Sequence, residues 1–228
     1  MTDLASGSGH QSSGLREFLR AIPVFETELP EFEPESAPTV PDELFTEWLV
    51  HAIEAGVREP HAMAVSTVDS DGRPTSRMLI LKRVSEGRWG FATLRTSRKG
   101  IELAQNPWAA VSFHWPDVGR QIRIRGKVIE TGPEEAARDF LARPLGSRAE
   151  SWAGNQSEVL ANREDLATAL DEAHAKVAAE PDAVPDGWTR YDLIADEVEF
   201  WQADRERRHK RLRYRLVGGV WTREQLWP

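Results

Sequence analysis

The sequence predicts a mainly β protein with flanking helices, in which short antiparallel strands form a barrel. Many short segments are apolar or alternate in polarity and end at turn residues, whereas only a few segments show helical spacing. A barrel is expected because closure of many short strands leaves no exposed sheet edge. The 228 residues suffice for a substantial core. We expect one domain over residues 41–228, including 185–228, after a flexible acidic arm at 1–40.

The composition argues against several classes of protein. The net charge of -8 opposes nucleic-acid binding, which needs a positive surface. Without cysteine the chain has no disulfide, thiolate metal site or cysteine nucleophile, and its six histidines lack the spacing of a metal site. No apolar run is long enough to span a bilayer, and the first residues lack the features of a signal peptide. We therefore expect a cytoplasmic protein that binds no metal, nucleic acid or membrane.

The first part of the chain is expected to comprise an arm and a helix. Residues 1–40 are rich in Gly, Ser, Glu and Pro, and this composition predicts little structure. Asp42 is expected to cap the helix that follows, and Gly56 to end it. The apolar residues of that helix recur at helical spacing and are Leu44, Phe45, Trp48, Leu49, Ala52 and Ile53.

Strands are expected to dominate the rest of the chain. The predicted strands are residues 62–68, 74–82, 89–93, 108–115, 121–128, 191–194, 198–202, 212–217 and 220–226. The predicted helices are residues 97–105, 133–142 and 158–180. In residues 121–128 polarity alternates strictly, so one face is apolar and the other carries Gln121, Arg123, Arg125 and Lys127. Four tryptophans on apolar faces are expected to fill the core, namely Trp48, Trp89, Trp108 and Trp115.

Three segments place fixed positive charge beside an apolar strand, namely residues 76–82, 97–99 and 198–211. This pattern suits a ligand with a flat ring and a phosphate, because arginine donates two parallel hydrogen bonds to a phosphate. Ser97-Arg98-Lys99 opens a predicted helix, whose free N–H groups favour an anion. Arg77 and Lys82 are five positions apart on one predicted strand, so they are expected to face opposite sides and serve different groups.

Taken in this order, the three segments resemble the flavin-binding pyridoxine/pyridoxamine 5'-phosphate oxidase family. The C-terminal signature of that family reads aliphatic-Glu-aromatic-Trp-Gln, four residues, then Arg-aliphatic-His-acidic-Arg. The chain keeps Glu199, Phe200, Trp201, Gln202, Arg207, His209 and Arg211, and departs from the signature at Arg208 and Lys210. The resemblance covers roughly residues 42–228 and implies a split β-barrel that binds flavin mononucleotide (FMN). It also implies a homodimer in which two subunits share each flavin site.

The resemblance further implies which residues form the site. The implied flavin contacts are Arg77, Met78, Leu79, Ile80, Leu81, Lys82, Ala92, Thr93, Ser97, Arg98, Lys99, Gln121, Gln156, Ser157, Trp201 and Arg211. The implied substrate contacts are Lys82, Arg143, Ser147, Arg207 and His209, and the last two are the catalytic candidates. Asp139 occupies the place of a family tyrosine, where a carboxylate would repel a phosphate.

The expected function is an FMN-dependent oxidase. By family analogy it would convert pyridoxine or pyridoxamine 5'-phosphate to pyridoxal 5'-phosphate, with molecular oxygen as acceptor and hydrogen peroxide as product. One alternative is a flavin oxidase of phenazine or other secondary-metabolite biosynthesis, which the chain resembles around residues 56–60 and 106–109. A second alternative is a non-catalytic flavin-binding protein.

Overall fold

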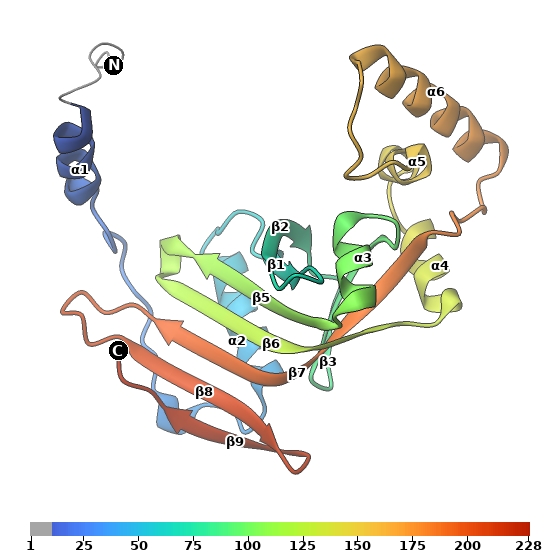
Figure 1. Ribbon diagram of the computed structural model, residues 1–228. Coiled ribbons are helices and arrows are strands. Elements are labelled where there is room, and N and C mark those ends of the chain that lie inside the picture. The colour runs from blue at the N-terminus through green and yellow to red at the C-terminus, as the bar shows by residue number, and fades with distance from the viewer. Residues whose placement is uncertain (1–10) are drawn as a thin grey trace.

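The structure, a computed structural model, describes residues 11–228 and is dominated by one curled antiparallel sheet (Figure 1). Its strands are β1 (Ala62–Val68), β2 (Pro74–Ile80), β3 (Arg83–Ser85), β4 (Arg88–Leu94), β5 (Trp108–Trp115), β6 (Arg120–Glu130), β7 (Trp188–Gln202), β8 (Lys210–Val217) and β9 (Val220–Gln225). The order is β2-β1-β5-β6-β7-β4-β3, and β8 pairs with both β7 and β9. The prediction of a mainly β fold with antiparallel strands and flanking helices is confirmed.

The helices lie around the sheet. They are α1 (Gln11–Ala21), α2 (Pro41–Glu54), α3 (Arg98–Gln105), α4 (Pro133–Leu141), α5 (Leu145–Ala153) and α6 (Arg163–Ala179), with short 3-10 turns η1 (Pro34–Ser36) and η2 (Pro116–Val118). Figure 1 shows α1 and the α5–α6 pair projecting on opposite sides of the sheet. None of the helices among the described residues is long and apolar enough to cross a membrane.

Strand β7 is longer than the sequence predicted. The two expected strands at 191–194 and 198–202 are one strand of 15 residues. Its first half pairs with β4, its second half with β8, and almost its whole length with β6. The β6–β7 register shifts between Arg125 and Gly126, and a Cβ on Gly126 would lie 2.0 Å from the carbonyl oxygen of Ile194. Glycine at this position therefore allows the two backbones to approach closely where the sheet bends.

The core lies between α2 and the concave face of the sheet. On α2, Leu44, Phe45, Trp48 and Ala52 are buried. The Phe45 ring lies 5.0 Å from that of Phe113, and the Trp48 ring lies 5.2 Å from that of Phe200. Such edge-on aromatic pairs add to the free energy gained from burying their apolar area. Trp89 and Trp115 are buried in the same cluster, as predicted.

Three predictions about the core and the α2 terminus are wrong. Ile53 is 58% exposed because it lies one residue beyond Ala52, off the buried stripe of α2. Trp108 is 46% exposed because the side chains of β5 alternate and its position falls on the outer face. Asp42 does not cap α2, since Val40 holds the N-cap position and the Asp42 carboxylate accepts a hydrogen bond from the backbone N–H of Gly87.

The expectation of an arm with little structure is wrong for its described part. Residues 11–21 form α1, and Phe32 is buried with its ring 5.0 Å from that of Trp48. The carbonyl of Pro38 accepts a hydrogen bond of 2.8 Å from the hydroxyl of Tyr214 on β8. Composition misses this structure because the partners are tertiary contacts, and Tyr214 lies more than a hundred residues away in the sequence. Residues 1–10 lie outside the described part.

Besides α1 and the two short 3-10 turns, β3 and α5 were not predicted, and several bounds differ. Strand β2 ends at Ile80, two residues before the predicted end. Helix α6 begins at Arg163 because the Asn162 side chain accepts a hydrogen bond from the backbone N–H of Asp165 and so caps it. The predicted alternation in β6 is confirmed, with Ile122 and Ile124 buried and the intervening basic side chains exposed.

Replacement of Gly126 by alanine is expected to destabilise the protein by about 2–3 kcal/mol, because the new Cβ would collide with the β7 backbone. The measurement is the midpoint of urea unfolding. Gly132→Ala is the matched control, since Gly132 has nothing within 4 Å of its Cβ position and an ordinary negative φ. Equal midpoints for the two variants would show that the β6–β7 contact does not need glycine.

Candidate functional site

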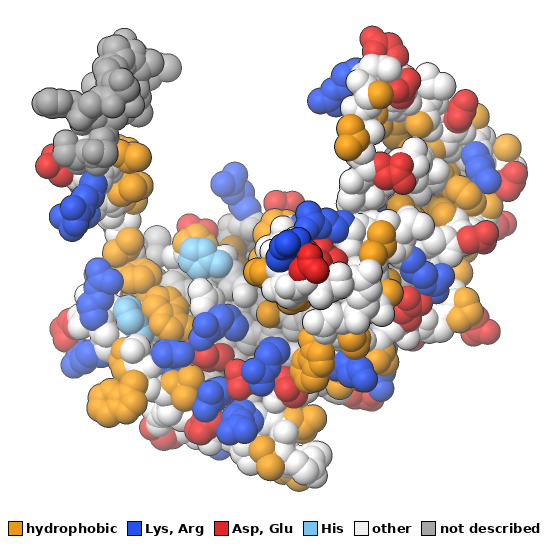
Figure 2. Space-filling model, viewed as in Figure 1, with side chains coloured by type: hydrophobic (Ala, Val, Ile, Leu, Met, Phe, Trp, Pro, Cys, Tyr) orange, Lys and Arg blue, Asp and Glu red, His pale blue; other side chains and the backbone are white. Residues whose placement is uncertain are grey.

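A cavity of about 1130 Å³ lies between strands β2 and β4 and the helices α4 to α6. Figure 2 shows the surface hollowed between the α5–α6 pair and the sheet. Of the predicted site residues, those that line the cavity are Met78, Leu79, Ile80, Lys82, Ala92, Thr93, Arg143, Ser147 and Gln156. Met78 and Ile80 are large exposed apolar residues, so this wall offers apolar surface to a flat ring.

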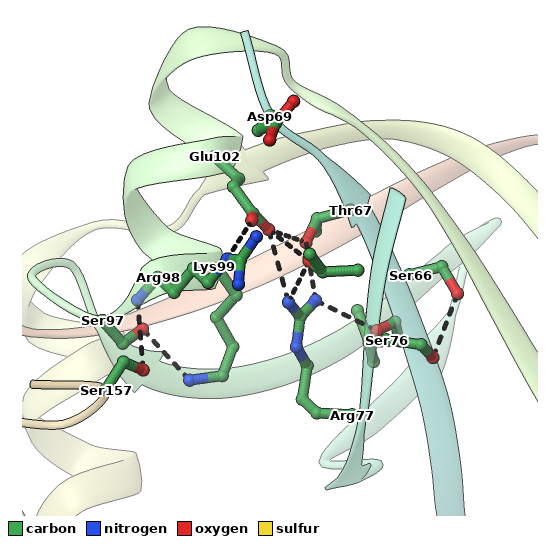
Figure 3. A network of polar contacts seen from close by, with 12 residues as sticks. Ser66, Thr67, Asp69, Ser76, Arg77, Ser97, Arg98, Lys99, Glu102 and Ser157 are labelled. Atoms are coloured by element: carbon green, nitrogen blue, oxygen red, sulfur yellow. Dashed lines mark hydrogen bonds and ion pairs between the residues drawn. The ribbon is translucent and has the colours of Figure 1, made fainter. Parts of the chain in front are cut away.

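A buried lysine stands directly behind this wall. The Lys99 ammonium donates a hydrogen bond to Ser97 Oγ at 3.0 Å (Figure 3). It also donates to Thr93 Oγ1 at 2.9 Å and to Gln156 Oε1 at 2.9 Å. Burial, with a smaller effect of the Arg77 charge, lowers the pKa of Lys99 to about 8. Among the described residues, no carboxylate lies within 4.0 Å of the Lys99 ammonium. A buried cation held only by neutral oxygens favours the binding of an anion.

Arg77 points away from the cavity toward α3. Its guanidinium donates to Thr67 Oγ1 at 2.6 Å and Thr75 Oγ1 at 2.5 Å, and lies 3.3 Å from Glu102 Oε2. Lys82 instead lines the cavity, so the two residues face different surroundings, although Lys82 lies beyond the end of β2 and strand alternation is not the reason. Leu81, which was also a predicted contact, packs against the core.

Glu102 is the carboxylate that holds this cluster together, and the sequence analysis missed it. It accepts hydrogen bonds from Thr67 at 2.5 Å, Thr75 at 2.7 Å and Arg98 at 2.9 Å (Figure 3). Burial alone raises the pKa of Glu102, but these hydrogen bonds and the Arg77 charge outweigh it and lower the pKa to about 2. The spacing of Arg98 and Glu102 on α3 was the available signal, because residues four apart on a helix are neighbours.

The cluster carries net positive charge. The cluster contains three cations, Arg77, Arg98 and Lys99, but only one carboxylate, that of Glu102, which contacts the two arginines, so the net charge is about plus two. The N-terminus of α3 adds a partial positive charge, with Ser97 as its N-cap and the Arg98 N–H 3.4 Å from Ser157 Oγ. The positive charge of the cluster, its hydrogen-bond donors and the N-terminus of α3 together fit a phosphate dianion.

The far end of the cavity is more acidic than predicted. Arg143 stacks over Trp188 at 4.3 Å and donates to Ser151 Oγ at 2.5 Å. Burial lowers the pKa of Arg143, although the nearby Asp139 and Glu150 act in the opposite direction. Asp139 also lines the cavity, and one of its carboxylate oxygens is buried without a hydrogen-bond partner. An unpaired buried carboxylate oxygen favours a ligand that donates a hydrogen bond to it.

The remaining predicted residues form a second group that does not reach this cavity. They are Gln121, Trp201, Arg207, His209 and Arg211. Trp201 lies opposite Gln121 on β6 and opposite Arg211 on β8, near the end of β7. Thr93 at the cavity lies opposite Thr189, near the start of β7. Twelve residues of strand separate these points, which is up to roughly 40 Å. One chain therefore does not bring the two groups together.

The second group has its own ordered structure. His209 Nδ1 accepts a hydrogen bond of 3.0 Å from the backbone N–H of Asp204, and its ring lies 4.7 Å from that of Trp201. Arg211 donates to a carboxylate oxygen of Glu199 at 2.9 Å, and Arg123 pairs with the other oxygen. Figure 2 shows basic and acidic side chains mixed over this face of β6 to β8.

Glu102→Gln is expected to destabilise the protein by about 3 kcal/mol at pH 7, because Arg77 and Arg98 lose their shared buried counter-charge. The pKa of about 2 lies below the ordinary 4.5, so this stabilisation is present above pH 4.5 and declines as the pH falls toward 2. Urea unfolding at pH 7 and pH 4 would therefore show a smaller gap between variant and wild type at pH 4. A gap that stays constant would contradict the role given to Glu102.

Comparison with known proteins places the chain in a family. Residues 49–177 match the family described as Pyridoxamine 5'-phosphate oxidase, and residues 188–228 match the Pyridoxine 5'-phosphate oxidase C-terminal dimerisation region. The pyridoxine/pyridoxamine 5'-phosphate oxidase of Pseudomonas fluorescens is 42% identical over 194 residues, which are 84% of this chain and 90% of that protein. The enzyme of the same name from Pseudomonas paraeruginosa is 42% identical over 195 residues, 85% of this chain and 91% of that protein.

Two solved structures resemble this chain in fold. PhzG from Burkholderia lata, in complex with tetrahydrophenazine-1-carboxylic acid, has a TM-score of 0.81 and 35% identity, and covers 89% of this chain and 99% of its own. A pyridoxamine 5'-phosphate oxidase-related, FMN binding protein from Nostoc punctiforme has a TM-score of 0.69, covers 83% of this chain and 98% of its own, and at 16% identity supports the fold alone. The predicted split barrel is thereby confirmed. The chain belongs to the pyridoxamine 5'-phosphate oxidase family of oxidoreductases.

Proposed function

We propose that the protein is an FMN-dependent oxidase that converts pyridoxine or pyridoxamine 5'-phosphate to pyridoxal 5'-phosphate, with molecular oxygen as electron acceptor. The observation that carries the proposal is the cationic cluster around Lys99, set behind a cavity of about 1130 Å³ that is also lined by Lys82, Arg143 and Ser147. The cluster around Lys99 suits the phosphate of a cofactor, whereas Lys82 and Arg143 suit an anionic group of a substrate. The names of the relatives support this assignment.

The residues present fit FMN. Arg98 and Lys99 would hold its phosphate together with the N-terminus of α3, Arg77 would add positive charge behind them, and the apolar wall at Met78 and Ile80 would face its ring. The flavin, when bound, supplies the hydride and oxygen chemistry. The chain's own residues bind the two anionic ends, orient the substrate against the cofactor and neutralise charge in a site partly closed to water. His209 and Arg207 are proposed to contact the reacting group.

A homodimer follows from the division of the site. The cavity group and the His209 group lie near opposite ends of β7, so a complete site needs the second group of another copy. Residues 188–228, which match a dimerisation region, contain Trp201, Arg207, His209 and Arg211. We therefore propose that two copies each complete the other's site.

One observation favours a second candidate, an oxidase of phenazine-type intermediates. Asp139 brings an unpaired carboxylate oxygen to the substrate end of the cavity, where a phosphate dianion would be repelled. The similarity to PhzG, which was solved with a tricyclic carboxylic acid, agrees with this alternative. A monoanionic or hydrogen-bond-donating substrate would tolerate Asp139 better than a phosphate ester.

FMN affinity is expected to fall as the pH rises above about 8, because the Lys99 ammonium then loses its proton in the free protein. The decrease should approach tenfold per pH unit, which is the limit for one linked proton. Fluorescence titration of the apoprotein between pH 7 and 9 measures it. Riboflavin, which lacks the phosphate, serves as the control ligand and should show no such step. Lys99→Met should bind FMN weakly at every pH, and a wild-type affinity that is flat across this range would contradict the phosphate assignment.

Anaerobic addition of pyridoxine 5'-phosphate to the flavin-loaded protein is expected to bleach the visible absorbance of the flavin, with recovery on admission of air. The doubly substituted Arg207→Ala/His209→Ala protein should keep its flavin but stay yellow, because the substituted residues face the substrate and not the FMN phosphate. If the wild type stays yellow with this substrate, tetrahydrophenazine-1-carboxylic acid is the next probe. Failure of both would point to a non-catalytic flavin-binding protein.

A further inference from the structure

We propose that Phe25, in the N-terminal arm, is a positioning residue that holds His209 in the tautomer whose Nε2 carries the proton. The inference rests on the proposed function in one respect only, since it takes His209 to be part of the substrate site. Phe25 belongs to the segment 1–40, which composition alone assigned to a flexible arm. The proposal gives that segment a role in orienting His209.

Three aromatic rings form a cluster at the end of β7. The Phe25 ring lies edge-on to His209 at 5.9 Å and tilted against Trp201 at 6.0 Å, while Trp201 and His209 lie 4.7 Å apart. Phe25 itself has a φ of 58°, a left-handed conformation that a bulky residue adopts only where its surroundings favour it. The Phe25 ring thus covers the histidine on the side of the arm and restricts its rotation.

The backbone of the loop after β7 determines which ring nitrogen bears the proton. His209 Nδ1 accepts a hydrogen bond from the Asp204 N–H at 3.0 Å, so Nδ1 carries no proton and the neutral ring is protonated at Nε2. The Asp204 carboxylate in turn accepts from the N–H groups of Glu206 at 2.7 Å and Arg208 at 3.2 Å. The closed turn holds this N–H in place, and the imidazole accepts from it only while the ring keeps its present orientation, in which Nε2 is available as a hydrogen-bond donor.

The arm is attached on both sides of this loop. Arg205 donates to the carbonyls of Glu26 at 3.1 Å and Thr27 at 2.8 Å. Lys210 donates to the carbonyl of Phe32 at 2.7 Å and pairs with the carboxylate of Glu33. The family signature has an acidic residue at the position of Lys210. A lysine here fits the arm of this chain, because it pairs with the acidic residue Glu33. Arg208, the other departure, pairs with Glu206 at the exposed surface.

These contacts together define what the arm does for the site. The arm and the loop hold Phe25 against His209, and the Asp204 N–H occupies Nδ1, so the histidine donates through Nε2 to a substrate oxygen rather than accepting a proton there. Removal of the Phe25 ring leaves the loop backbone in place but frees the imidazole to rotate away from the Asp204 N–H, and once that hydrogen bond is lost the ring exchanges tautomers.

Long-range ¹H–¹⁵N spectra of the imidazole nitrogens in the flavin-loaded protein, without substrate, test the inference directly. His209 is assigned from the signals that disappear in His209→Asn. The wild type should show a single neutral tautomer protonated at Nε2. Phe25→Ala and Phe25→Leu should show averaged or mixed tautomers, whereas Phe25→Tyr, which keeps the ring, should match the wild type. Val24→Ala is the control for a neighbouring exposed side chain.

Turnover of the same variants provides the second readout. Phe25→Ala should lower kcat about tenfold and change KM less, because misorientation of a donor affects the reacting geometry more than binding. The inference is overturned if Phe25→Ala keeps the single tautomer of the wild type, whatever its kcat. Since the spectra need no substrate, this result is separate from failure of the proposed oxidase activity, which would leave every variant inactive and the tautomer result intact.

Discussion

The geometry of the molecule depends on β7. This strand of 15 residues pairs with β4 at one end, with β8 at the other and with β6 along most of its length. It therefore determines the distance between the cavity group near Thr93 and the aromatic group near Trp201. A bend at the β6–β7 register shift, made possible by Gly126, directs the two ends toward different parts of the surface.

Electrostatics determines what the cavity can bind. Buried charges are costly unless they are paired, and the cluster of α3 and β2 contains three cations but only one carboxylate, which pairs with the two arginines and not with Lys99. Thr67, Thr75, Thr93 and Ser97 supply the oxygens that keep these cations ordered. A phosphate would complete the balance of charge. At the other end of the cavity the unpaired Asp139 oxygen works against a second phosphate, and this opposition is the physical basis for two candidate substrates.

The N-terminal arm and the C-terminal signature form one structural unit although the chain separates them widely. Side chains from the loop after β7 and from β8 and β9 donate to backbone carbonyls of the arm, at Thr27, Phe32 and Pro38 among others. An extended segment without helical or strand periodicity is thus held by long-range hydrogen bonds. Its acidic character, which composition revealed, is complementary to Lys210, which pairs with Glu33.

Local patterns in the sequence determined most of the strands, the α3 cap and the chemical character of the cavity wall. The alternation in β6 and the Ser97-Arg98-Lys99 helix start predicted burial and charge correctly, because both depend on neighbours within a few residues. The family's motifs also indicated the residues that we propose for both halves of the site.

Only the tertiary structure decided which of those residues meet. Glu102 joins Arg77, Phe25 covers His209, and the cavity and histidine groups lie apart, none of which spacing could reveal. The reason is physical: periodicity reports the face on which a side chain lies, whereas the identity of its partner depends on how distant strands pair and bend.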